Sequence, residues 1–208
     1  MSSSGQATSH SPVRIDRYIA IVNMCADTHA DKDIANGNAL HARYLIEKLF
    51  RVANSSVGII TGCLRQSDPD GVAIYAHPPV IEAAREFLRK EGSKLTIVVQ
   101  SGEVDGGQDE NAFVKAVAAD TGRAGEFEIL VARPGSIDDA PHCMIADKSA
   151  YRLELGAAGD DNIAAIANFG NPGVAASLAD YFRDVVAYLR GDSHLVSDKQ
   201  IGAVSLAA

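Results

Sequence analysis

Two short stretches of the chain contain residue types that could support nucleophilic or acid–base chemistry. Residues 142–155 read HCMIADKSAYRLEL, and residues 166–172 read IANFGNP. The imidazole of His142 can act as a nucleophile or a general base, and the ammonium group of Lys148 can neutralise an anion. Asp147 and Asn168 can add hydrogen bonds from a carboxylate and an amide. These four side chains predict a polar site built from strand ends and turns.

Each of these residues also has a structural interpretation. His142 suits the end of a sheet, where both ring nitrogens can find hydrogen-bond partners. Asp147 and Lys148 suit a solvated hairpin turn, because Asp is a routine turn former. Asn168 suits hydrogen bonding to the backbone near a helix start. The sequence alone leaves both interpretations open.

Helical and strand-like segments alternate along the chain before this region. Apolar residues recur at helical spacing from Ala39 to Ala53, after Pro78 and Pro79, around residues 113–117, and from Pro172 to Gly191. Buried-type strands are predicted at 57–62, 95–100 and 127–132, and further strands at 142–147, 150–155 and 162–169. The run 13–25 fits either a strand or a helix. Alternation followed by consecutive strands predicts an α/β fold with a mixed sheet flanked by helices.

The overall composition narrows the class of protein. The chain has 208 residues, enough for one domain, and a formal net charge of −8, which disfavours broad binding of nucleic acid. Its three cysteines lack metal-site or disulfide spacing, and no apolar run is long enough for a membrane span. His29 and the acids around it are expected to form a polar loop. We therefore expect a cytoplasmic protein with no cofactor and no metal.

Several segments resemble the phospholipase D-like superfamily. The helix–strand units HARYLIEKLFRVANSSVGIITG and PPVIEAAREFLRKEGSKLTIVVQ look like those of its domain, and HCMIADKSAYRLEL with IANFGNP looks like its catalytic strands and Asn-containing turn. The resemblance covers roughly residues 39–189. It implies a single phospholipase D-like lobe at 34–191, preceded by a flexible segment at 1–33 and followed by a tail at 192–208.

The catalytic motif of that family is His-x-Lys, four residues, Asp, and later Gly-Ser-x-Asn. Its His attacks phosphorus, its Lys neutralises phosphate, and two such motifs complete a site. With His142 as the nucleophile, Met144 stands at the Lys position and Ser149 at the Asp position. With Asp147 at the Asp position, His142 falls on the Lys position and Ala140 on the His position.

The resemblance therefore implies a degenerate member of the superfamily. It would act as a binding, sensing or assembly module with little or no phosphodiesterase activity. The alternative is an active, metal-independent phosphodiesterase or nuclease, with His142, Lys148 and Asn168 as catalytic residues, and Asn168 and Asp147 binding phosphate. Because the family completes its site from two lobes, the resemblance also implies a homodimer that binds a phosphate-containing ligand.

Overall fold

The protein is built on one seven-stranded mixed sheet, shown by a computed structural model that describes residues 12–64, 74–100, 111–119, 125–155 and 164–191. The strand order is β1-β7-β6-β5-β2-β3-β4. The strands are β1 (Ile34–Asn36), β2 (Ser56–Thr61), β3 (Lys94–Val99), β4 (Glu126–Val131), β5 (Cys143–Ala146), β6 (Ala150–Glu154) and β7 (Ala165–Asn168). Strands β2, β3 and β4 are parallel, and the remaining pairs are antiparallel. The predicted α/β class with a mixed sheet is confirmed.

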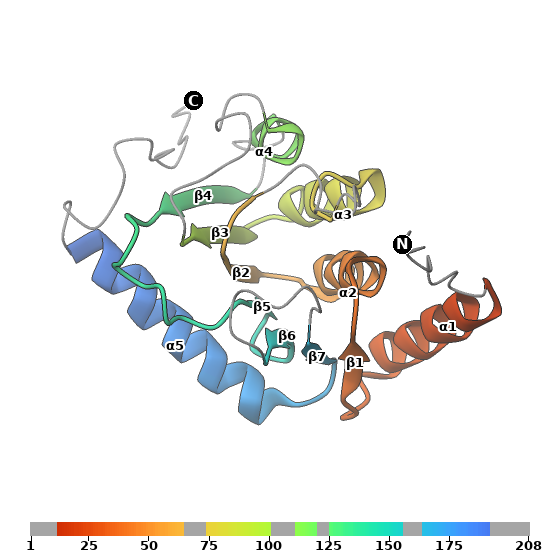
Figure 1. Cartoon of the computed structure of the whole chain (residues 1–208). Coiled ribbons are helices and arrows are strands. Elements are labelled where there is room, and N and C mark those ends of the chain that lie inside the picture. Colours follow the sequence, from red (N-terminus) through yellow and green to blue (C-terminus); the bar gives the residue numbers. More distant parts are fainter. Residues whose placement is uncertain (1–11, 65–73, 101–110, 120–124, 156–163, 192–208) are drawn as a thin grey trace, which may run out of the picture.

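Helices cover both faces of this sheet (Figure 1). Four helices lie on one face: α1 (Pro12–Thr28), α2 (Ala39–Val52), α3 (Pro78–Leu88) and α4 (Ala112–Ala118). The fifth, α5 (Pro172–Gly191), crosses the other face. Asparagine side chains cap three of the helices: the carbonyl oxygens of Asn38, Asn111 and Asn171 accept N–H groups of the first turns of α2, α4 and α5.

The two faces have separate hydrophobic cores. Phe50, Phe87 and Phe113 fill the larger core, beneath α1 to α4. The smaller core, beneath α5, contains Ile145 and Leu189. Alternate residues of each strand enter opposite cores, which explains why these strands read as continuous apolar runs.

The N-terminal part of the chain differs from the sequence-based expectation. Residues 12–28, within the segment predicted to be flexible, form α1, and its Val22 and Cys25 are buried in the larger core. Residues 34–36, predicted as loop, form β1 by pairing with β7. Both elements depend on tertiary contacts that local periodicity does not encode. Residues 1–11 and the predicted tail at 192–208 lie outside the described residues.

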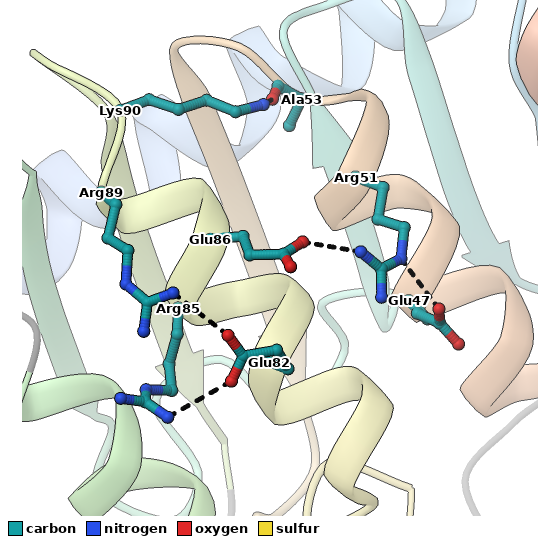
Figure 2. A network of polar contacts seen from close by, with 8 residues as sticks. All are labelled: Glu47, Arg51, Ala53, Glu82, Arg85, Glu86, Arg89 and Lys90. Atoms are coloured by element: carbon teal, nitrogen blue, oxygen red, sulfur yellow. Dashed lines mark hydrogen bonds and ion pairs between the residues drawn. The ribbon is translucent and has the colours of Figure 1, made fainter.

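The exposed side of α2 and α3 carries a network of ion pairs (Figure 2). The guanidinium of Arg51 bridges Glu47 of its own helix at 2.8 Å and Glu86 of α3 at 2.6 Å. The ammonium group of Lys90 donates to the carbonyl of Ala53. Exposed pairs of this kind contribute about 0–1 kcal/mol each, so the network orients the two helices and adds little stability.

No helix in the described part of the chain has the length and apolar character needed to cross a bilayer.

Candidate functional site

His142 lies at the edge of the sheet where the parallel strands end. It directly precedes β5, beside Gly62 and Gln100, the first residues after β2 and β3. A Cβ atom on Gly62 would lie 3.0 Å from Cε1 of His142, so the glycine makes room for the imidazole. In open α/β sheets, ligands bind outside the carboxyl ends of the strands. His142 therefore stands where a site is expected.

Both ring nitrogens of His142 are engaged by other side chains. Nδ1 lies 2.7 Å from Oε2 of Glu154, and Nε2 lies 2.6 Å from Oε1 of Gln100. The side chain is about a quarter exposed, and Glu154 is exposed to a similar degree. The imidazole is thus held from two sides at the carboxyl edge of the sheet.

The orientation of the Gln100 amide is fixed by the loop between β4 and β5. Its Nε2 donates to the carbonyl of Ile137 at 3.0 Å and to that of Ala140 at 2.6 Å. Both amide hydrogens are therefore used, and Oε1 is left to accept a hydrogen bond from Nε2 of His142. A ring nitrogen that donates has no free electron pair, so His142 in this arrangement cannot attack phosphorus through Nε2.

Glu154 links His142 to a buried cation. Nη1 of Arg152 donates to Oε1 of Glu154 at 2.9 Å, and the Arg152 side chain is only 7% exposed. Burial raises the pKa of Glu154, but the hydrogen bond from His142 and the charge of Arg152 outweigh it, so the pKa lies below its ordinary value. Both oxygens of Glu154 are thus engaged, Oε1 by Nη1 of Arg152 and Oε2 by Nδ1 of His142.

Arg152 places a cation on the strand next to Met144. It lies directly opposite Met144 in the β5–β6 pairing, and opposed residues of antiparallel strands share a face. The guanidinium of Arg152 therefore lies on the same face of the sheet as the side chain of Met144. Nε of Arg152 is buried and has no hydrogen-bond partner among the residues that the structure describes.

A partly buried tyrosine, Tyr75, lies close to the same group. Burial raises the pKa of Tyr75, Arg152 lowers it, and Glu154 raises it again, so the phenol stays neutral. The side chain of Thr61, at the end of β2, hydrogen-bonds Tyr75, and its hydroxyl donates to the carbonyl of Cys63 at 3.1 Å.

Asp147 and Lys148 lie at the opposite end of β5 from His142. Both have positive φ angles, 52° and 58°, in the turn between β5 and β6. The Asp147 carboxylate accepts the backbone N–H groups of Ser55 at 2.8 Å and Ser56 at 2.7 Å, and that of Asn54. Burial raises the pKa of Asp147, but these hydrogen bonds outweigh it and lower the pKa overall. The carboxylate thus ties the turn to the loop that follows α2.

Lys148 is exposed and faces α5. Its Nζ lies 3.7 Å from Oδ1 of Asp180, and 58% of its side chain is accessible. Its ammonium group therefore lies beside the last helix, away from the His142 end of β5.

Asn168 is buried in a separate polar cluster. Its Nδ2 donates to Asp31 at 2.9 Å and to Asp33 at 3.0 Å, and its Oδ1 accepts from the N–H of Gly170. In the sheet it lies opposite Tyr151, near the turn end of β6, whereas Glu154 lies at the other end.

The described structure does not bring the sequence-predicted residues together. His142 is at the carboxyl edge, whereas Asp147, Lys148 and Asn168 are at the opposite edge, because β5 and β7 present those residues at their far ends. The partners of His142 were missed in the sequence. The available signal was a charged pair two residues apart, Arg152 and Glu154, within an apolar strand and hence on one face. No group of three or more His, Cys, Asp or Glu side chains suited to a metal ion occurs among the described residues.

Comparison with known proteins identifies similarity at the level of fold. No family model matches the chain, and no curated protein matches it. Nuc, a phospholipase D family member from Salmonella typhimurium, is 13% identical over 74% of this chain and 93% of its own, with a TM-score of 0.46. NucT from Helicobacter pylori is 9% identical over 74% and 95%, with a TM-score of 0.45.

A third solved structure extends over more of the chain. TrmBL2, described as an archaeal chromatin protein with a novel mode of DNA binding, is 10% identical with a TM-score of 0.51. The match covers 85% of this chain and 61% of that protein. At these identities the likenesses concern the fold alone.

Proposed function

We propose that the protein is a binding module with a phospholipase D-like fold and little or no phosphodiesterase activity. The observation that carries the proposal is the engagement of both ring nitrogens of His142 by Gln100 and Glu154. A histidine nucleophile needs a free electron pair on the attacking nitrogen. Here that nitrogen faces a carbonyl oxygen whose orientation is fixed by two further hydrogen bonds.

The ligand that fits this site is an anion bearing phosphate. Glu154 lies between two positively charged or proton-donating groups, His142 and Arg152, as a phosphate group would. Its carboxylate thus acts as an internal anion that keeps the cations paired when the site is empty. A phosphate competing with Glu154 for Arg152 would change the network and give the module a sensing function.

Binding of inorganic phosphate to the whole chain tests this proposal. Isothermal titration calorimetry should detect binding by wild type and its loss in Arg152→Gln, with Arg89→Gln as a control on the exposed side of α3. A crystal soaked in phosphate should show the anion between His142 and Arg152. Failure of phosphate to bind both wild type and Glu154→Gln would overturn the assigned ligand.

The predicted roles of Asn168, Asp147 and Lys148 concern the opposite edge. Their contribution to phosphate binding is a separate proposal, tested by titrating Asn168→Ala in parallel. A loss of affinity equal to that of Arg152→Gln would favour a ligand that reaches this edge.

Nucleic acid is the less favoured ligand. TrmBL2 is described as a DNA-binding protein, but the present chain has a net charge of −8, which repels a polyanion. Fluorescence anisotropy with labelled duplex and single-stranded DNA should therefore show no saturable binding at physiological salt.

The three free cysteines suit a reducing compartment, and we propose the cytoplasm.

A further inference from the structure

A groove lies between α5 and the sheet, at the edge opposite to His142. Its volume is about 310 Å³, at the low end of the range of small-molecule sites. Ser56 and Lys94 are paired at the start of β2 and β3, and Gly58 and Thr96 are paired two residues further along these strands. All four residues line the groove. The groove thus opens at the amino ends of the strands and is separate from the site proposed above.

The inner surface of the groove is apolar. Ile145 and Val186 contribute to it, together with Ala179 and the ring of Phe182. Phe182 lies directly on Gly58, where a Cβ atom would be only 2.9 Å from the ring. The absence of a side chain at Gly58 therefore lets the aromatic ring form one wall. A free phosphate or a nucleotide would find few hydrogen-bond partners on such a surface.

The rim of the groove is cationic. Among the described residues that line it, none is a carboxylate and four are basic: Lys94, Lys148, Arg183 and Arg190. They converge from β3, from the β5–β6 turn and from two positions on α5. Each has roughly half or more of its side chain accessible.

Carboxylates outside the groove pair with these cations. Nζ of Lys94 lies 2.8 Å from Glu126, and Nη1 of Arg183 lies 3.0 Å from Asp180. Both pairs are exposed, and exposed pairs contribute about 0–1 kcal/mol. An anionic group held at the rim by an apolar tail in the groove can therefore recruit Lys94 and Arg183 at little cost, whereas Arg190 is held by two hydrogen bonds to the carboxylate of Glu128.

We propose that this groove binds an amphiphile with one apolar chain and an anionic head group, of which a medium-chain fatty acid is the simplest member. The chain would lie against Phe182 and Ile145, and the carboxylate would lie at the rim near Lys94 and Arg183. This site goes beyond the function proposed above, since it uses the opposite edge of the sheet and none of the residues around His142.

Calorimetric titration of the whole chain with hexanoate, octanoate and decanoate tests the proposal. Kd should tighten about fourfold for each added methylene until the groove is full. Decanol, which has the same chain without the charge, should bind at least about tenfold more weakly than decanoate.

Two kinds of variant locate the ligand. Ala179→Phe fills the groove and should abolish decanoate binding, with the melting temperature as a check of folding. The double variant Lys94→Gln, Arg183→Gln keeps the groove and should weaken decanoate about tenfold while leaving decanol unchanged. Arg89, directly after α3, is likewise exposed and ion-paired, and Arg89→Gln should change neither affinity.

Three results would overturn the proposal. They are no saturable binding of decanoate to folded wild type, equal affinity for decanol and decanoate, or unchanged affinity in the double variant. A wild-type dimer that Ala179→Phe converts to a monomer, without decanoate binding, would assign the groove to a second copy of the chain instead.

Discussion

At the scale of single residues, Gln100 determines what His142 can do. Its amide is locked by the carbonyls of Ile137 and Ala140, so it presents an acceptor to Nε2 of the imidazole. Glu154 presents a second acceptor to Nδ1. The same histidine in front of a donor would keep a free electron pair, so the chemistry of the site depends on a neighbour from another strand.

Glu154→Gln should increase the affinity for inorganic phosphate. The substitution removes the charge of Glu154 and leaves Arg152 buried beside a neutral amide. An external phosphate then binds Arg152 without competition from the Glu154 carboxylate. We expect Kd to fall at least about tenfold relative to wild type, measured by calorimetry at pH 7. An affinity unchanged from wild type would show that Glu154 does not occupy the anion position.

Asp147→Asn should remove part of the pH dependence of stability. The native-state pKa of Asp147 is lowered, so its contribution is complete above the ordinary aspartate pKa of about 3.9 and is lost as the pH falls through the lowered value. Asparagine tolerates the positive φ but loses the charge, and we expect a cost of roughly 1–3 kcal/mol at pH 7. The difference from wild type should shrink with acidification.

Urea unfolding at several pH values measures this difference. Asp184→Asn is the control, because that side chain is 77% exposed on α5. A gap between wild type and Asp147→Asn that stays constant from neutral to acid pH would contradict the proposed role of the carboxylate.

At the scale of elements, α5 is the helix that covers the second core, against apolar residues of the sheet. Leu189 is fully buried against the sheet, whereas its neighbour Tyr188 is 54% exposed. The seven-residue and three-residue spacings of its apolar residues predicted this helix and its buried face from sequence.

Leu189→Ala should therefore destabilise the protein by roughly 2–5 kcal/mol, since it leaves a cavity between α5 and β2–β5. Tyr188→Ala, one residue earlier on the exposed side, should stay within about 0.5 kcal/mol of wild type. Equal shifts in the urea midpoint for both variants would mean that α5 is not packed as described.

Elements with strong local signals were predictable, and those that depend on pairing were not. The helices α2, α3 and α5 and the central strands follow from periodicity, capping and proline positions. The strand β1 forms by pairing with β7, and α1 is stabilised by burial of Val22 and Cys25. Neither the β1–β7 pairing nor the packing of α1 can be predicted from the pattern of neighbouring residues.

The same limit applies to the site. His142 was predicted at a sheet end, but its partners are 42 residues before it and 12 after it. Which strands become neighbours is set by the sheet order, and the order β6-β5-β2-β3 brings Glu154 and Gln100 to either side of the imidazole. Sequence similarity had instead grouped His142 with Asn168, which the register places at the far end of the sheet.

At the scale of the whole molecule, we expect a homodimer that joins two carboxyl edges about a two-fold axis. Leu155, directly after Glu154, is 61% exposed at this edge, an apolar side chain suited to an isologous contact. Light scattering at roughly 30 μM should return twice the chain mass, because an interface with Kd about 1 μM is mostly occupied there. Leu155→Glu should give a monomer, and a monomeric wild type would refute the expectation.

The absence of turnover is the central claim for the molecule, and it has one direct test. The rate of hydrolysis of bis(p-nitrophenyl) phosphate, with and without a chelator, should be measured for wild type, His142→Ala and Met144→Lys. We predict that wild type and His142→Ala both stay at the uncatalysed rate, because Gln100 and Glu154 occupy both ring nitrogens. Met144→Lys alone should not restore activity, since it supplies a cation but frees no nitrogen. Chelator-insensitive turnover by wild type that is lost in His142→Ala would contradict the account and identify the protein as an active phosphodiesterase.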